Sequence, residues 1–369
     1  MFTFTIGQTD GLPQSIINMV LAVAEDAANY WGRYLNFGAA TLDITINFVP
    51  LGDTTLAQAG PTFFFERTGP GGVDVFQAGP ILELQDGIDP NGSTVDIDID
   101  VNSDTIRANE FFLGGLSNPN VPFNQFDLFT VLLHEIGHGL GILAFEEGPG
   151  GDVSVYELFV DTVMSQLVFT GPNAAAVFGG NVPLDGDGSH IGATFTDVMN
   201  AALANGERLF LSPIDIAVLQ DAEAPVRTPT NGADVLFGFE SFSIFGADSV
   251  SLLGGDDIYD GLSGNDTVDG GSGNDTIIGG AGADSLDGGA DFDTVDYQAS
   301  ASPVNVNLTT GSGSGGHAAG DTYANIEAVI GTGGADTITG GVGVDSLVGG
   351  FGNDTLDGSV GDDTLSGEN

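Results

Sequence analysis

The sequence predicts two domains of different fold class: an α+β domain over residues 1–224 and an all-β domain of parallel strands over residues 225–369. Two observations support this division. The first half mixes helical and strand periodicities, and it contains an apolar helix with two histidines. From about Pro225 the composition changes to Gly, Asp, Asn and Ser in a nine-residue period. A chain of 369 residues is long enough for two domains, of which one can hold a full core.

Helical and strand patterns alternate along the first half. Residues 12–34 place apolar side chains at three- and four-residue steps after Pro13, which predicts a long amphipathic helix. Residues 41–49 alternate apolar and polar side chains, as a half-buried strand does. Residues 62–84 are expected to form two or three short strands separated by Gly-Pro and Gly-Gly turns. Ser212 begins a last helix that closes the domain.

A further alternating segment, residues 95–101, places Asp96, Asp98 and Asp100 on one face of a strand. Three carboxylates in a row can bind a cation. A solvated strand face is the interpretation we favour, because antiparallel and edge sheets commonly expose one polar face.

The charge balance limits the partners of the protein. Asp and Glu number 52 and the basic residues only five, which gives a formal charge of −47. Nucleic acid and anionic membrane both need a basic face and are excluded as partners, whereas divalent cations would relieve the repulsion. The chain has no cysteine, so it has no disulfide or thiolate metal site. We expect no transmembrane segment, no cleaved amino-terminal signal and a monomeric protein.

The chemistry of the first domain centres on residues 124–144. Their apolar residues recur with a helical period, and His134 and His138 lie four residues apart, so that both imidazoles face the same point. Glu135 is rotated away from a shared metal and is placed to take a proton from metal-bound water. This is the H-E-x-x-H signature of a zinc ion with a carboxylate general base. The alternative is a pair of core histidines that happen to share this spacing.

A hydrolytic zinc ion needs three protein ligands and an open position for water. In the metzincin pattern H-E-x-x-H-x-x-G-x-x-H, Gly141 matches the glycine, but Ala144 stands at the third histidine. The two remaining histidines are His190 and His317, and His317 lies between the repeat arrays of the other domain. His190 precedes Met199 by nine residues.

This arrangement resembles leishmanolysin-type metzincins, in which an inserted segment separates the glycine from the third histidine. The resemblance implies that His190 is the third zinc ligand and that Met199, within Asp197–Asn200, lies in a tight turn below the metal. The alternatives are a surface-loop histidine and an ordinary core methionine. A protease joined to repeats also resembles the serralysin architecture, although Ala201 stands where serralysins can have a tyrosine ligand.

The expected mechanism follows from the charge of the metal. Three neutral imidazoles leave zinc its positive charge, which lowers the pKa of its bound water to around neutrality. Glu135 takes the proton, hydroxide attacks the peptide carbonyl, and Glu135 passes the proton to the leaving amine. The substrate is expected to lie extended along an edge strand of the sheet.

The second domain consists of nine-residue units, such as residues 261–269, 270–278 and 279–287, in arrays at about 243–296 and 331–369. An irregular segment, residues 297–330, separates the arrays. The units resemble the calcium-binding nonapeptide of RTX proteins, G-G-x-G-x-D-x-U-x. The resemblance implies a parallel β-roll that is disordered without Ca²⁺. The expected calcium ligands share one phase of the repeat: Asp257, Asp266, Asp275, Asp284, Asp293, Asp336, Asp345, Asp354 and Asp363. A flexible Gly/Asp linker is the alternative, but such a linker has no reason to hold a phase.

The sequence therefore favours a secreted, extracellular zinc endopeptidase with one catalytic Zn²⁺, several structural Ca²⁺ ions and a protein or peptide substrate. The RTX resemblance implies export by type I secretion. Ala144 favours an alternative function, an extracellular calcium-binding matrix or adhesin-type protein with an inactive protease-like domain. A hydrolase that acts on something other than peptide has the same ligands.

Overall fold

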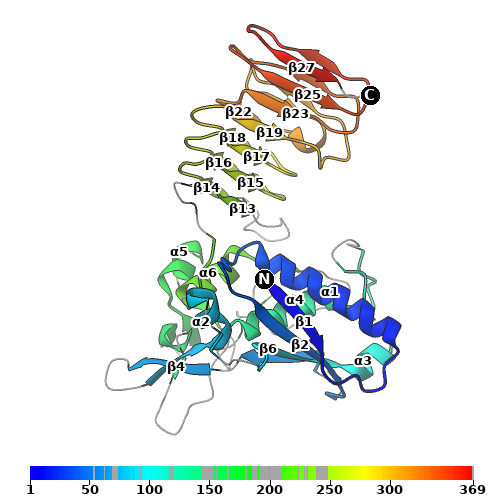
Figure 1. Cartoon of the computed structure of the whole chain (residues 1–369), viewed down its shortest axis with the longest axis vertical. Helices are drawn as coiled ribbons and strands as arrows, with labels where there is room; N and C mark the ends of the chain where they lie inside the picture. Colours follow the sequence, from blue (N-terminus) through cyan, green and yellow to red (C-terminus); the bar gives the residue numbers. More distant parts are fainter. Residues whose placement is uncertain are drawn as a thin grey trace. The chain divides into compact units, whose positions relative to one another are not determined.

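The chain forms two compact units, Met1–Arg227 and Thr228–Asn369, which are described separately (Figure 1). The computed structural model describes residues 1–52, 55–61, 63–68, 74–87, 89–90, 94–115, 120–142, 153–154, 156–163, 166–178, 181–184, 190, 199, 209–222, 224–227, 229, 232–237 and 248–367. No helix among these residues is long and apolar enough to cross a membrane.

The first unit is built on a four-stranded sheet in the order β1 (Phe2–Ile6), β2 (Leu42–Val49), β6 (Ile97–Asn102) and β3 (Ala57–Pro61). The first three strands are parallel, and β3 runs antiparallel to β6 at the edge. The alternation predicted for β2 and β6 is confirmed, because one face of these two strands is fully buried. Its buried residues in β2 and β6 are Leu42, Ile44, Ile46, Phe48, Ile97, Ile99 and Val101.

Two helices pack against each other and against this sheet: α1 (Gln14–Gly32) contacts β1, and α4 (Leu128–Gly139) contacts β3 and β6. The indole of the buried Trp31 in α1 donates a hydrogen bond to the Leu133 carbonyl in α4, at 2.8 Å. The Asp127 side chain caps α4 by accepting from the amide of Thr130. The two predicted helices are thus confirmed, and the sheet and α1 fix the position of α4.

The structure corrects the expectation for residues 62–84. Two strands form there, β4 (Phe63–Thr68) and β5 (Asp74–Ala78), but the segment that follows is the helix α2 (Gly79–Asp86). Pro80 lies in its first turn, where the missing amide costs no hydrogen bond, and Gly87 ends it with a φ of 66°. Strand β1 was not expected.

The remaining elements of the first unit are short. Helix α6 (Pro213–Asp221) begins with a capping box between Ser212 and Asp215, as predicted for the last helix. The others are α3 (Ser103–Arg107), β7 (Phe111–Phe112), β8 (Phe126–Asp127), β9 (Val153–Ser154), η2 (Tyr156–Phe159), β10 (Val160–Val163), β11 (Gln166–Phe169), α5 (Pro172–Phe178) and β12 (Val182–Pro183).

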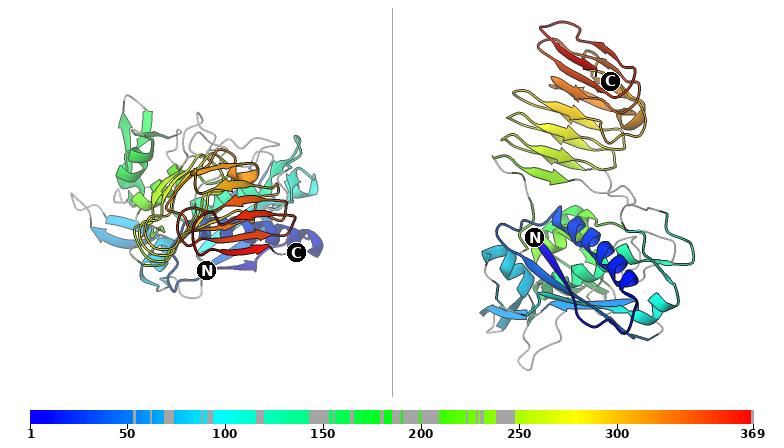
Figure 2. Two further views of the ribbon diagram at one scale, coloured as in Figure 1. Left: turned by 90° about the horizontal axis from the view of Figure 1, so that it is seen from above. Right: turned by 45° about the vertical axis from the view of Figure 1, so that its right-hand side comes forward.

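The second unit is a roll of short strands in two sheets (Figure 2). One sheet is parallel throughout: β13 (Val235–Phe237), β15 (Ile258–Asp260), β17 (Thr276–Ile278), β19 (Thr294–Asp296), β23 (Ala328–Ile330), β25 (Ser346–Gly350) and β27 (Thr364–Gly367). The other has the order β14 (Ser249–Ser251), β16 (Thr267–Asp269), β18 (Ser285–Asp287), β22 (Thr322–Ala324), β21 (Ser312–Ser314), β20 (Asn305–Asn307), β24 (Thr337–Thr339) and β26 (Thr355–Asp357). The single aliphatic residue of most repeats, such as Val268, Ile277 and Leu286, is buried between the sheets.

Residues 297–330 depart from the nine-residue period, yet they join the two arrays into one continuous roll. Strand β22 pairs in parallel with β18, and β20 pairs in parallel with β24. Between them β21 runs antiparallel to both neighbours. The segment therefore contributes an inserted hairpin to one sheet while the other sheet continues unbroken from β19 to β23.

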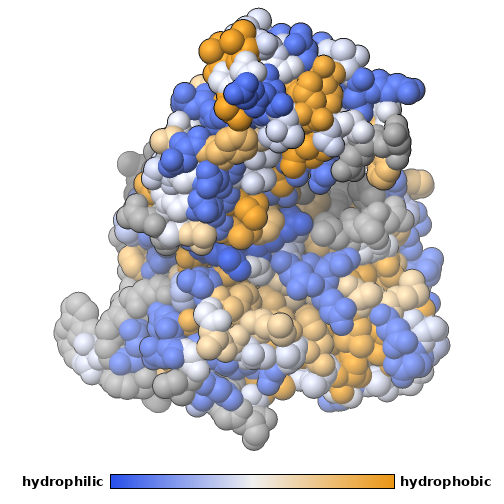
Figure 3. All heavy atoms as spheres, turned by 45° about the horizontal axis from the view of Figure 1, so that its top comes forward, coloured by the Kyte–Doolittle hydropathy of each residue, from blue (hydrophilic) through white to orange (hydrophobic). Residues whose placement is uncertain are grey.

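The surface of the roll carries isolated apolar residues. Figure 3 shows hydrophilic side chains interspersed with apolar patches on one face of the molecule. Exposed large hydrophobic residues include Val342, Phe351 and Val360, which occupy the variable position between the glycines of their turns. These turn residues are exposed, whereas the inward-pointing residues of the strands form the core of the roll.

Candidate metal centre

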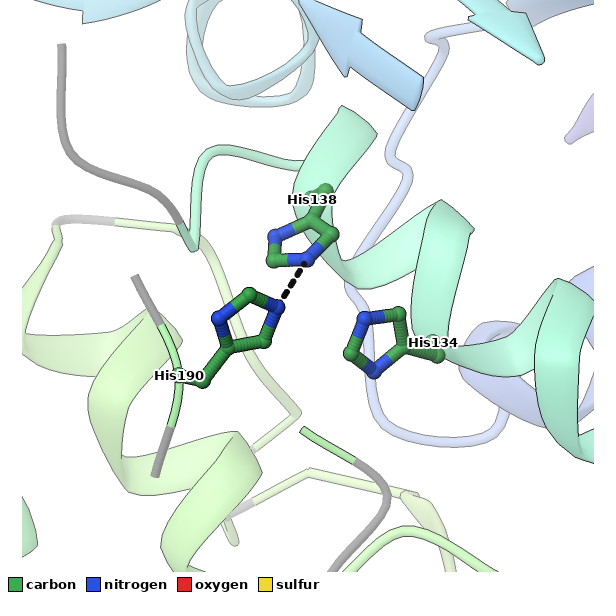
Figure 4. Close-up of side chains that lie close together, drawn as sticks. All are labelled: His134, His138 and His190. Carbon is green, nitrogen blue, oxygen red and sulfur yellow. Dashed lines mark hydrogen bonds between the residues drawn. The ribbon is translucent and has the colours of Figure 1, made fainter. Parts of the chain in front are cut away.

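Three histidines from distant parts of the first unit come together (Figure 4). His134 and His138 project from α4 and are buried, and His190 is half-buried. The Nε2 atoms of His138 and His190 lie 3.2 Å apart, and one ring nitrogen of each histidine lies within 4.8 Å of the others. The rings of His134 and His190 are stacked, whereas the His138 ring is nearly perpendicular to both. The structure thus brings together the three residues predicted as zinc ligands.

The end of α4 orients the His138 ring. Gly141 adopts a φ of 105° and its amide donates to the His138 carbonyl, while the Ile142 amide donates to the Gly137 carbonyl. These two bonds form a Schellman motif, in which the left-handed position favours glycine. The turn places the Ile142 carbonyl 2.7 Å from Nδ1 of His138. A proton on Nδ1 then donates to this carbonyl, which leaves the Nε2 lone pair available to a metal.

Met199 lies against the helix between the two histidines. Its side chain is fully buried, and a Cβ on Gly137 would lie 2.5 Å from the Met199 sulfur and 3.1 Å from the Trp31 ring. Gly137 therefore lets the methionine approach the helix backbone. The other residues of the expected turn, Asp197, Val198 and Asn200, lie outside the described residues, as does Ala144.

Glu135 lies between α4 and the edge strand β3. Its side chain is buried, and burial raises the pKa of its carboxyl to about 8, although a hydrogen bond from the Ala59 amide opposes the shift. Ala59 belongs to β3, so this amide connects the expected general base to the open edge of the sheet. Sequence reasoning did not identify the Ala59 amide or the Ile142 carbonyl, because backbone groups leave no residue signature.

The remaining candidates lie elsewhere. His317 belongs to the roll, in η3 (Gly316–Ala318), and does not join the three histidines. Asp98 and Asp100 both accept from the Asn47 side chain on the polar face of the sheet. Asp96 precedes β6 and is buried, so the face expected to carry three solvated carboxylates carries two.

The predicted calcium ligands of the roll form a regular pattern. The Oδ1 atom of Asp275 accepts from the Asp257 amide at 2.9 Å, and Asp275 in turn donates its amide to Asp293. The same bond between residues eighteen positions apart recurs at Asp266, Asp284, Asp354 and Asp363. Within the described residues the other oxygen, Oδ2, is buried and has no hydrogen-bond partner at Asp257, Asp266, Asp275, Asp284, Asp293 and Asp354. Buried carboxylate oxygens without donors are hard anionic ligands of the kind that Ca²⁺ prefers.

The first glycine of each unit leaves room for this oxygen. A Cβ at Gly270 would lie 2.6 Å from Oδ2 of Asp275, and the same close approach recurs at Gly261, Gly279 and Gly331. Burial raises the pKa of Asp266 and of Asp284 to about 7 and that of Asp293 to about 6. Below these pH values the carboxyls hold protons in the absence of a cation, and a cation would displace the protons.

Several positions of the described roll differ from this pattern. The Asp284 amide donates to Asp321, whose second oxygen accepts from the Tyr297 hydroxyl at 2.6 Å. At Asp336 and Asp345 the Oδ2 atoms accept from the amides of Thr332 and Gly341. At Asp321 in the inserted segment, the Tyr297 hydroxyl therefore satisfies the carboxylate oxygen that has no donor at the positions that follow the regular pattern.

Comparison with known proteins identifies the repeats. The family model of the RTX calcium-binding nonapeptide repeat, four copies long, matches residues 245–268, 260–295 and 329–368. No curated protein matches the chain. The second unit therefore contains calcium-binding RTX repeats in parallel strands, which confirms the calcium prediction.

Proposed function

We propose that the first unit hydrolyses peptide bonds with a zinc ion held by His134, His138 and His190, and that the protein is a secreted endopeptidase. The observation that supports this proposal is the convergence of three imidazoles beside a buried glutamate. RTX repeats are typical of extracellular proteins exported by type I secretion, which supports the proposed location.

The donor set fits zinc. Tetrahedral zinc with Zn–N distances of about 2.0–2.1 Å separates neighbouring nitrogens by about 3.3 Å, close to the 3.2 Å between His138 and His190. When bound, zinc lowers the pKa of a coordinated water toward neutrality and polarises a carbonyl group. The three histidines hold the ion, and the Ile142 carbonyl fixes the tautomer of His138.

Glu135 is the general base in this proposal. Burial raises the pKa of its carboxyl above the ordinary value, and a zinc ion held by the three histidines would favour the ionised carboxylate, which is the form that accepts a proton. The carboxylate takes the proton of the attacking water and passes it to the leaving amine. The neighbouring Ala59 amide holds the side chain close to the edge of the sheet.

The edge strand β3 offers a place for the substrate. In the described sheet β3 pairs with β6 on one side only, so its other edge can add an extended peptide by main-chain hydrogen bonds. Because the Ala59 amide contacts Glu135, a peptide along this edge passes the general base.

The alternative of an inactive protease-like domain rested on Ala144 at the usual third-ligand position. The His190 ring lies within reach of the other two histidines without that residue, which weakens the alternative.

The proposal is tested by cleavage of casein at fixed calcium, with and without a zinc chelator. Glu135→Gln should retain one zinc ion per chain and lose activity by about 10²–10⁴-fold, since it keeps the shape but removes the base. Glu25→Gln, at an exposed position of α1, is the matched control and should cleave like the wild type. Unchanged cleavage by Glu135→Gln would reject this mechanism, and cleavage unaffected by the chelator would reject zinc.

A further inference from the structure

A second group of acidic side chains lies in the first unit, apart from the three histidines. One carboxylate oxygen from each of Glu83, Asp89 and Asp96 lies within 4.8 Å of the others. Glu83 belongs to α2, Asp89 follows that helix after the turn at Gly87, and Asp96 precedes β6. The group therefore lies where α2 meets the beginning of the central sheet.

The backbone holds two of these side chains in place. The Thr41 amide donates to Oε1 of Glu83 at 3.1 Å, and the Asp43 amide donates to Oδ2 of Asp96 at 2.6 Å. The backbone amide of Asp96 also donates a hydrogen bond to the Asp43 carbonyl. Asp43 belongs to β2 and Thr41 directly precedes this strand, so the two carboxylates are fixed relative to the sheet.

The second carboxylate oxygen of Glu83 is buried, and the carboxyl groups of Asp96 and Asp89 are its acidic neighbours. Glu83 is only 5% exposed, and its Oε2 is buried and has no hydrogen-bond partner within the described residues. A buried carboxylate oxygen without a donor is costly unless a proton or a cation satisfies it. Burial is the main cause that raises the pKa of the Glu83 carboxyl to about 7, and the neighbouring carboxylates of Asp96 and Asp89 raise it as well.

The Met1 amino group does not satisfy this oxygen. It acts on Glu83 only through space, because its hydrogen bond goes to the Ala40 carbonyl.

The donor set selects the kind of cation. Three carboxylates without nitrogen or sulfur ligands favour a hard ion. Ligands on opposite sides of Ca²⁺ lie about 4.6–5.2 Å apart, given Ca–O distances of about 2.3–2.6 Å, so the observed spread fits one coordination sphere. Mg²⁺ demands a smaller and more regular octahedron.

We infer that Glu83, Asp89 and Asp96 bind a Ca²⁺ ion that ties α2 to the central sheet. This site is separate from the RTX repeats and does not depend on the proposed zinc chemistry. It makes the first unit, as well as the roll, respond to calcium.

The test uses hydrogen–deuterium exchange of the full chain, read by mass spectrometry on peptides from residues 79–102, with and without added Ca²⁺. This local readout separates the site from the calcium ions of the roll. Calcium should slow exchange in these peptides of the wild type. Asp89→Asn, at an exposed position, should need on the order of tenfold more calcium for the same protection. Glu83→Gln should lose the calcium effect.

Two controls keep the outcome decisive. Glu25→Gln, also in the first unit, should respond like the wild type, and so should Asp275→Asn, which removes a ligand of the roll. Absence of any calcium effect on residues 79–102 of the wild type would overturn the inference and leave a carboxyl pair that shares a proton. An undiminished effect in Asp89→Asn would overturn it too, since the response would then come from elsewhere.

Discussion

At the scale of single residues, glycines determine the geometry of both kinds of site. Gly137 admits the Met199 sulfur to the helix backbone, and Gly141 turns the chain so that a carbonyl orients His138. In the roll, Gly270 leaves space for the Asp275 carboxylate. Each glycine lies beside a predicted metal ligand and supplies the room or the turn that this side chain needs.

Gly137→Ala should destabilise the first unit by about 1–3 kcal/mol, because its Cβ would overlap Met199 and Trp31 in a packed core. Urea unfolding measures this loss. Gly32→Ala at the end of α1 is the matched control, because its nearest neighbour would lie 3.8 Å from the new Cβ. A Gly137→Ala protein as stable as the control would show that Met199 does not pack against α4.

The side chains of the candidate metal centre could be predicted from the sequence, but the backbone groups that contact them could not. The histidine spacing and the Met199 position are visible in the sequence because specific side chains carry them. The Ala59 amide and the Ile142 carbonyl are backbone groups, and only tertiary structure brings them to Glu135 and His138. For the same reason the pairing of Glu83 with Asp96 could not be predicted, since the two lie in different elements.

At the scale of elements, strong periodicity predicted α1, α4, β2 and the repeats, whereas short segments were misjudged. Helix α2 was taken for a strand, although Pro80 before Ile81 and Leu84, with Gly87 after them, is a helix signal. Eight residues are too few for periodicity to separate a helix from a strand. The inserted segment of the roll could not be predicted, because its strands do not keep the repeat.

Tyr297→Phe tests the role of that inserted segment. The change removes the hydroxyl that donates to the buried Asp321 and contacts the Tyr323 hydroxyl, and it should cost about 1–3 kcal/mol of roll stability. Because a tyrosine and not a cation satisfies Asp321, the loss should be the same at low and at saturating calcium. Thermal unfolding of the two proteins in a calcium series measures it. A loss that vanishes at high calcium would mean that an ion can replace the hydroxyl.

At the scale of the whole molecule, the acidic composition makes folding depend on cations. The formal charge is −47, and the buried Asp side chains of the roll lack basic partners among the described ion pairs, which join Arg107 to Asp10 and Asp104. Most repeats bury one aliphatic residue each, which is too little to fold without stacked neighbours. Calcium therefore belongs to the folded state of the roll.

Without calcium, the roll should lose stability as the pH rises from about 4 to about 7. Asp266 and Asp284 have pKa values of about 7 in the folded state and 3.8 as the ordinary value, so the folded chain binds more protons in this window. Their contribution is fully present below about pH 4 and is lost as the pH rises through about 7. Calcium should reverse the trend, because its binding releases these protons.

Thermal unfolding of the calcium-free chain at pH 5 and pH 8, followed by circular dichroism, measures this dependence. Asp266→Asn removes one titrating group and should reduce the difference between the two values of pH. A calcium-free roll that is more stable at pH 8 than at pH 5 would contradict the raised pKa values of these buried aspartates.

We propose that His134 and His138 of α4 and the distant His190 share one zinc ion. The measurement that tests it most directly is the zinc content and zinc affinity of His190→Ala, compared with His317→Ala as the control. We expect one zinc ion per chain in the wild type and in the control, and a loss of zinc in His190→Ala at the same free zinc concentration. Full retention of zinc by His190→Ala would contradict the account.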